Sequence, residues 1–184
     1  MANPYPISRR RFVAAGAGLV VGPMLLSPDG RAEAHIPSTA GGSLPSGLFA
    51  LGVASGDPLP EAVVIWTRLA PKPLDGGGMP DRAVRVRWEV AEDERFHRVV
   101  RRGVALAHPL VGHSVHVDVQ GLRPDSVYHY RFRAGTEISP VGRTRTAPAP
   151  HSRPRQLRFA FASCQDYQAG FYTAHRHLAA EDLA

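Results

Sequence analysis

Three segments of the chain alternate between apolar and polar residues with a period of two. Apolar side chains occupy every second position in residues 84–90, 115–119 and 128–132. This alternation predicts strands with one buried and one solvated face. Two more strands are expected at residues 62–67 (AVVIWT) and 138–146, and clusters of Gly, Pro and Asp separate the segments. Roughly half a dozen short strands in about 100 residues predict a mainly β fold, a β-sandwich.

One turn in this region has a recognisable pattern. Residues 121–130, GLRPDSVYHY, are similar to the fibronectin type III pattern of Leu-x-Pro followed by Tyr-x-Tyr. A tyrosine near the start of such a strand can bond its hydroxyl to upstream backbone and lock the corner of the sandwich. We expect Trp66 to be a core residue between the sheets. The alternative is an exposed aromatic ring that stacks on a sugar.

A different pattern follows the proline-rich segment APAPHSRP at residues 147–154, which is typical of a domain boundary. From Leu157 to Phe161 the chain is apolar on both faces after Arg158, as in a strand buried on both sides. A polar loop follows, and then Phe171, Ala174 and Leu178 recur at helical spacing. We expect this strand to lack the neighbours and covering helices that it needs, and the sequence to be incomplete.

The N-terminus has the features of an export signal. Arg9 and Arg10 precede a mildly apolar stretch, and Ala32 and Ala34 are small residues at alternate positions, so we place cleavage after Ala34. The arginine pair resembles a twin-arginine signal, whose passengers are exported already folded. The apolar stretch is 14 residues long and interrupted by Gly and Pro, whereas a membrane span needs about 20. We expect no stable membrane span.

The net charge of +6 raises the question of a nucleic-acid partner. The predicted leader holds four arginines and two acids, so the remainder of the chain carries +4. The remaining basic residues look scattered along the sequence, whereas a nucleic-acid site needs them on one face. We therefore expect no nucleic acid as a specific partner.

The only cysteine, Cys164, is the main candidate for chemistry. An exported protein with one cysteine cannot form an internal disulfide, so the thiol is buried, bound to a metal or a nucleophile. A nucleophile needs a basic partner, and His175 and His177 lie two positions apart on the predicted helix, on different faces. No histidines stand at a persuasive zinc-ligand spacing, and we expect most of them on the solvated surface.

Several segments together resemble the PhoD-like alkaline phosphatase family. They are the twin-arginine leader, FALGVASGDPLPEAVVIWTRLAP at residues 49–71, SPVGRTRTAP at 139–148 and FASCQDYQAGFYTAHRHLAAEDL at 161–183. The resemblance implies an exported, periplasmic or secreted phosphatase that hydrolyses phosphate esters with Fe3+ and Ca2+. It also implies that Cys164, in the ASCQ motif, ligates the iron.

The residue patterns and the resemblance together predict the order of parts. They are a signal peptide at 1–34, a linker at 35–47, a fibronectin III-like or Ig-like β-sandwich at 48–148, a second linker at 149–156, and the first strand and helix of an α/β metallophosphoesterase domain at 157–184. Because one ligand cannot hold a catalytic ion, we expect this chain alone to be inactive. The alternative function is an exported β-sandwich module that binds carbohydrate or a cell-surface partner.

Overall fold

The computed structural model describes residues 43–184 except 155, 157, 165, 167, 169, 182 and 184. The predicted signal residues Arg9, Arg10, Ala32 and Ala34 lie outside the described residues, and their export role stays a prediction. The chain divides into two compact units between Ala147 and Pro148, and each is described by itself.

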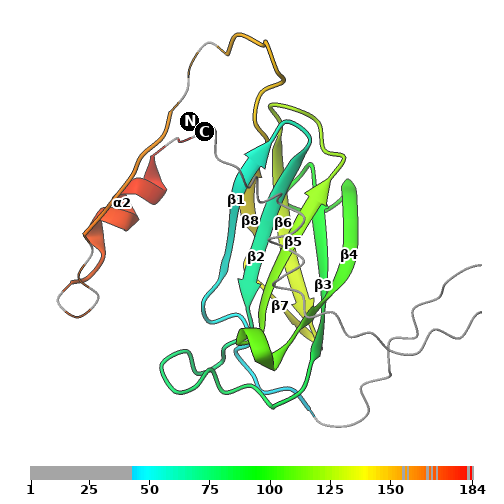
Figure 1. Cartoon of the computed structure of the whole chain (residues 1–184), viewed down its shortest axis with the longest axis vertical. Coiled ribbons are helices and arrows are strands. Elements are labelled where there is room, and N and C mark those ends of the chain that lie inside the picture. The colour runs from blue at the N-terminus through cyan, green and yellow to red at the C-terminus, as the bar shows by residue number, and fades with distance from the viewer. Residues whose placement is uncertain are drawn as a thin grey trace, which may run out of the picture. The chain divides into compact units, whose positions relative to one another are not determined.

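The first unit is a sandwich of two antiparallel sheets (Figure 1). One sheet has the order β1-β2-β5, with β1 at Val53–Leu59, β2 at Ala62–Arg68 and β5 at Ser114–Gln120. In the other sheet β4 (Val99–Ala107) pairs with β3 (Val84–Ala91), and β3 pairs with β6 (Val127–Ala134). The short strands β7 (Glu137–Ile138) and β8 (Gly142–Arg145) both pair with β6. The expected mainly β sandwich is confirmed.

The core lies between the two sheets and uses the apolar positions of the alternating strands. Its largest fully buried side chains come from β2, β3, β5 and β6, with Leu48 and Leu69 from the flanking loops. Tyr130 and Phe132 pack edge to face inside it, with ring centroids 6.2 Å apart. The whole core cluster falls between Leu48 and Ala134, so the sandwich buries its own core without residues 148–184.

Four of the five strand predictions are confirmed, at 62–67, 84–90, 115–119 and 128–132. The fifth, at 138–146, is two short strands, because Ser139, Pro140 and Val141 interrupt the pairing with β6. Two strands were missed. β1 contains Gly, Asp and Pro, which are typical of turns, but it is an edge strand with a register shift between Gly56 and Leu59. β4 alternates poorly because it too lies at a sheet edge.

The prediction that Trp66 is a core residue is wrong. Val63, Ile65 and Thr67 of β2 are fully buried, so the alternation places Trp66 on the outer face of its sheet. There it is half-buried, beside His116 at 6.4 Å between ring centroids. The tryptophan that packs against the core is Trp88 on β3.

In the second unit, the described residues of the segment Leu157–Phe161 do not form the expected strand. Described residues 158–164 belong to no strand, and Phe159 and Phe161 are 74% and 84% exposed. An apolar strand needs a sheet on either side, and this unit provides none in its described residues. The predicted helix is confirmed as α2, Thr173–Ala180. Among the described residues, no helix is both long and apolar enough to cross a bilayer.

Candidate functional site

Cys164 lies in the exposed segment that precedes α2. Its side chain is exposed, which contradicts the buried alternative, and its backbone has a φ of 54°, in the left-handed region that non-glycine residues rarely adopt. Within the described part of the chain, no three His, Cys, Asp or Glu side chains lie together so as to hold a metal ion. Neither the ligand nor the nucleophile alternative is decided by these contacts.

The turn after Cys164 is organised by its own side chains. Oδ1 of Asp166 accepts a hydrogen bond from the backbone N–H of Gln168 at 2.9 Å. Tyr172 stands at the N-cap of α2 with a φ of 52° and makes no side-chain cap bond. The ring of His175 lies 6.3 Å from that of Tyr172. The sequence prediction of polar loop and helix therefore holds locally, while the predicted strand before them is absent.

Three histidines of the sandwich, His113, His116 and His129, differ in burial and in their contacts. His113 is buried, and its Nε2 lies 3.1 Å from the backbone oxygen of Arg82. His116 is exposed beside Trp66, and partial burial lowers the pKa of its imidazole. His129 is half-buried on β6, and its Nδ1 has no hydrogen-bond partner among the described residues. The expectation of a solvated surface holds for His116 and is wrong for His113.

The segment Ser55-Gly56-Asp57-Pro58, part of the 49–71 segment that carries the family resemblance, lies within β1. Its residues are exposed, and Asp57 has a φ of 51° at the register shift. Burial raises the pKa of the Tyr130 phenol, and a hydrogen bond with the Ser55 side chain opposes this shift. The segment therefore helps to close the sandwich.

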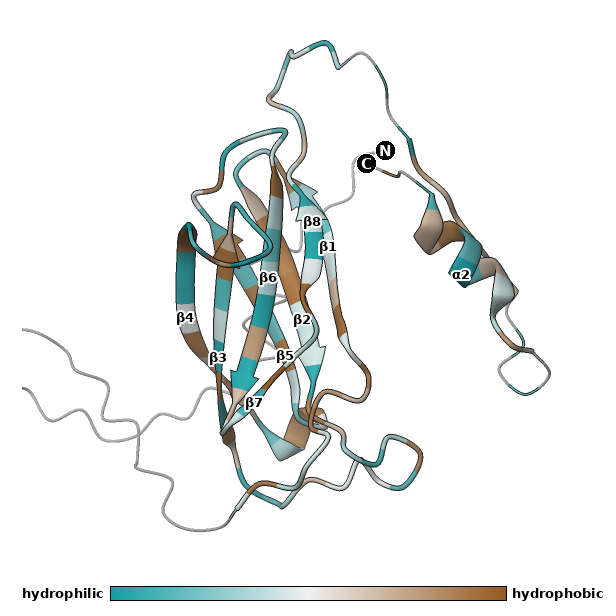
Figure 2. Cartoon of the chain, turned by 180° about the vertical axis from the view of Figure 1, so that it is seen from behind, coloured by the Kyte–Doolittle hydropathy of each residue, from teal (hydrophilic) through white to brown (hydrophobic). Residues whose placement is uncertain are grey.

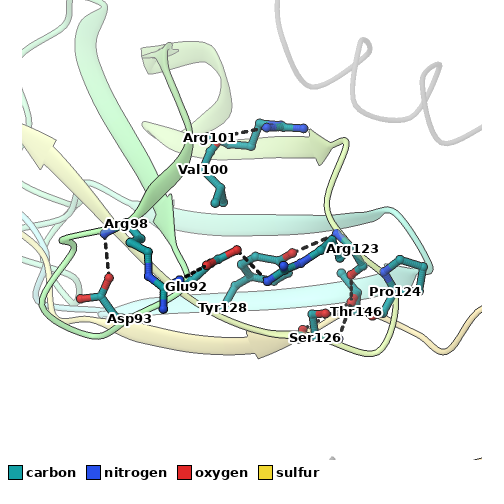
Figure 3. A network of polar contacts seen from close by, with 10 residues as sticks. All are labelled: Glu92, Asp93, Arg98, Val100, Arg101, Arg123, Pro124, Ser126, Tyr128 and Thr146. Carbon is teal, nitrogen blue, oxygen red and sulfur yellow. Dashed lines mark hydrogen bonds and ion pairs between the residues drawn. The ribbon is translucent and has the colours of Figure 1, made fainter.

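The tyrosine corner predicted from residues 121–130 is present (Figure 3). The hydroxyl oxygen of Tyr128 accepts a hydrogen bond from the backbone N–H of Arg123 at 2.9 Å. Thr146, which directly follows β8, also bonds to this turn. Its Oγ1 donates to the Arg123 carbonyl oxygen at 2.6 Å and accepts from the Ser126 N–H at 3.0 Å. These bonds satisfy polar groups at a partly buried turn and stabilise it.

Glu92 connects this corner to the β3–β4 hairpin, and Asp93 stabilises the hairpin itself. Glu92 forms ion pairs with Arg123 at 2.6 Å and with Arg98 at 3.3 Å (Figure 3). Asp93 accepts from the backbone N–H groups of His97 and Arg98, at 3.0 and 2.8 Å. These two bonds lower the pKa of Asp93 below 3.8. The network is structural, since both carboxylates already have partners in the hairpin or in the corner.

Sequence reasoning missed one group of charged side chains. It treated the arginines after the leader as scattered, but seven of them lie on one face of the five-stranded sheet. The available signal was the repeated spacing of two, in Arg85 and Arg87, Arg131 and Arg133, and Arg143 and Arg145. Residues two apart on a strand share a face, so adjacent strands bring these pairs together.

Comparison with known proteins identifies relatives of the chain. A family model described as the N-terminal domain of PhoD-like phosphatases matches residues 37–148. The chain is 52% identical over 175 residues to alkaline phosphatase D of Bacillus subtilis (strain 168). That match covers 95% of this chain and 30% of the relative. A solved structure of PhoD matches with a TM-score of 0.76 and 57% identity, over 78% of this chain and 27% of that one.

Proposed function

Because the chain belongs to the PhoD-like phosphatase family, we propose that it is the N-terminal part of a metal-dependent enzyme that hydrolyses phosphate esters. One observation carries the proposal. The 52% identity to an alkaline phosphatase extends over 175 residues, well beyond the β-sandwich and into the second unit. The chain spans under a third of that relative's length, so the activity belongs to the longer protein.

We assign Cys164 the role of an iron ligand in that protein. A thiolate is an anionic donor that suits a transition metal, and Cys164 is exposed and available to one. The described residues of this chain do not themselves fit Fe3+ or Ca2+, because they bring no second and third donor to the thiol. No catalytic step through a metal therefore follows from these residues, and this chain alone should be inactive.

Export by the twin-arginine route is part of the same proposal. It is supported by Arg9, Arg10 and the small residues Ala32 and Ala34. Export after folding suits a protein whose metal is loaded before it leaves the cytoplasm. The product would be periplasmic or secreted, with a phosphate ester as substrate.

Phosphatase activity and metal content test the proposal together. In a protein of the relative's length, Cys164→Ser should lower the bound iron and the rate of phosphate release together, by at least about tenfold. Ser152→Ala, an exposed linker residue, is the matched control and should change neither. Full iron content and full activity in Cys164→Ser would refute the ligand assignment. Phosphate release by the 184-residue chain supplied with iron and calcium would refute its inactivity.

One observation favours the alternative of a carbohydrate-binding module. Trp66 is on the outer face of the three-stranded sheet. Its cross-strand partner on β1 is the small residue Ala54, and the next outward position of β2, Val64, faces Gly56. An accessible indole can stack on a sugar ring. Quenching of tryptophan fluorescence by a soluble oligosaccharide, lost in Trp66→Ala, would support this function, and unchanged fluorescence with a panel of oligosaccharides would exclude it.

A further inference from the structure

The outer face of the five-stranded sheet carries a dense array of arginines. Cross-strand register places all of them on the side away from the core, because their neighbours at alternate positions, such as Val86 and Phe132, are buried. Figure 2 shows this sheet from behind, with hydrophilic bands along its strands. We call this surface the arginine face; it comprises Arg85, Arg87, Arg102, Arg131, Arg133, Arg143 and Arg145.

Acids neutralise only part of this charge. Arg131 pairs with Glu89 at 2.7 Å, and Arg145 pairs with Asp125 at 2.7 Å. Across the described residues no ion pair involves the other five arginines, and all five are exposed. The face therefore keeps a strong positive field, which attracts an anionic partner.

The arrangement of two of these arginines opposes folding. Arg87 on β3 and Arg133 on β6 stand directly opposite each other in the register. Like charges at directly opposed positions of neighbouring strands destabilise a sheet. Since the fold gains nothing from this pair, its placement points to a ligand outside the fold.

The other side chains on the face indicate what kind of anion fits. Leu106 and Val104 of β4 and Ile138 of β7 are each close to half exposed, and they pair with Arg85, Arg87 and Arg133. None of the residues that the strands place on this face is Phe, Tyr or Trp. The rings beside it are the half-buried imidazole of His129 and the buried Phe96, which Arg131 already covers at 4.0 Å, so little aromatic surface is open to a nucleobase. The arginines are spread over four strands in two dimensions, which suits a planar array of phosphates better than one linear chain.

We propose that the arginine face docks on an anionic phospholipid surface. The guanidinium groups bind headgroup phosphates, because their planar set of N–H donors suits phosphate oxygens. The aliphatic side chains at the two edges of the sheet enter the interface between headgroups and acyl chains. This is peripheral attachment through one face. It is independent of phosphate ester hydrolysis and of Cys164.

Vesicle binding tests the proposal. Residues 35–184, which omit the arginines of the leader, are mixed with phosphatidylcholine vesicles that do or do not contain phosphatidylglycerol. Binding should require phosphatidylglycerol and weaken as salt rises. The double variant Arg87→Gln/Arg133→Gln should bind about 25-fold more weakly, at about fivefold per arginine. The control Arg153→Gln/Arg176→Gln changes the same charge at exposed positions of the second unit and should bind within about twofold of the parent.

Two further measurements separate the proposal from its rivals. The double variant should melt no lower than the parent, because it removes a like-charge pair, so weaker binding cannot come from misfolding. Val104→Ser/Leu106→Ser should weaken vesicle binding and leave binding of soluble polyphosphate unchanged. Equal losses in the face and control variants would overturn the proposal. Tighter binding, per phosphate, to polyphosphate or to single-stranded DNA than to the vesicles would also overturn it. So would vesicle binding that the serine substitutions leave unchanged.

Discussion

At the scale of single residues, the sandwich is held by side chains that satisfy particular backbone groups. Tyr128 is 2% exposed, yet its hydroxyl bonds to upstream backbone, as the pattern at 121–130 predicted, and the structure shows that the partner is the N–H of Arg123. Cys164 shows the reverse. Its residue type and motif point to a metal, but no local contact of the described residues decides its role. A local bond follows from local sequence, whereas a metal site needs donors from distant parts of a chain.

The first prediction concerns the tyrosine corner. Tyr128→Phe should lower the free energy of unfolding by about 1–3 kcal/mol, because it leaves the partly buried Arg123 N–H without an acceptor. Arg123→Ala removes only the ion pair with Glu92, in which the Arg123 side chain is 70% exposed, and should cost less than about 1 kcal/mol. Urea denaturation measures both. A loss for Tyr128→Phe no larger than that for Arg123→Ala would contradict the prediction that the hydroxyl is the stronger of the two contacts.

The second prediction concerns pH and Asp93. Its pKa is lowered in the folded state by backbone N–H groups of His97 and Arg98, so its contribution to stability is present above the unfolded value of 3.8. That contribution is lost as the pH falls through the lower folded pKa. Asp93→Asn should therefore melt below the parent at pH 5–7, and the two should converge in more acidic buffer. Thermal melts across this range check the sign, and a gap that widens in acid would contradict it.

At the scale of elements, period-two alternation identified β2, β3, β5 and β6 and missed β1 and β4. β2, β3, β5 and β6 alternate because one face of each meets the core. β1 and β4 are edge strands with neighbours on one side only, so Gly, Asp, Pro and consecutive arginines are tolerated in them. The wrong prediction for Trp66 has a related cause. The alternation in β2 already placed Trp66 on the opposite face from Val63 and Ile65, and this local pattern is stronger evidence than the general tendency of tryptophan to be buried in sandwiches.

The third prediction tests the packing of β8 on β6. Gly142 lies against the side chain of Tyr130, and an added Cβ would overlap two of its ring carbons and its hydroxyl oxygen. Gly142→Ala should therefore destabilise the sandwich by about 1–3 kcal/mol through overpacking. Gly56 on β1 has open space around it and no positive φ, so Gly56→Ala is the matched control, with an expected change within about 0.5 kcal/mol. Similar melting temperatures for the two variants would show that β8 shifts to accommodate the added methyl group without loss of stability.

At the scale of the whole molecule, the chain combines a sandwich with its own core and a second unit whose described part has none. Every described residue from 149 to 164 is exposed, including Phe159 and Phe161. α2 buries no residue. The sandwich should therefore behave as an autonomous domain, while the second unit depends on further structure for its apolar side chains.

The fourth prediction follows from this difference. Limited proteolysis should cut between residues 148 and 164 first and leave a resistant fragment that contains β1 to β8, because cleavage needs exposed backbone without a sheet. Mass spectrometry of the early products measures the order of cleavage. Early cuts within the sandwich, with residues 157–184 intact, would contradict it.

The sequence by itself determined the sandwich, its central strands, the tyrosine corner, the helix and the family, because these depend on periodicity, on short motifs and on contacts between near neighbours. Tertiary structure alone decided the edge strands β1 and β4, the outward position of Trp66 and the exposure of Phe159 and Phe161. It also decided that arginines from four strands form one face, since strand register joins residues that are far apart in the chain.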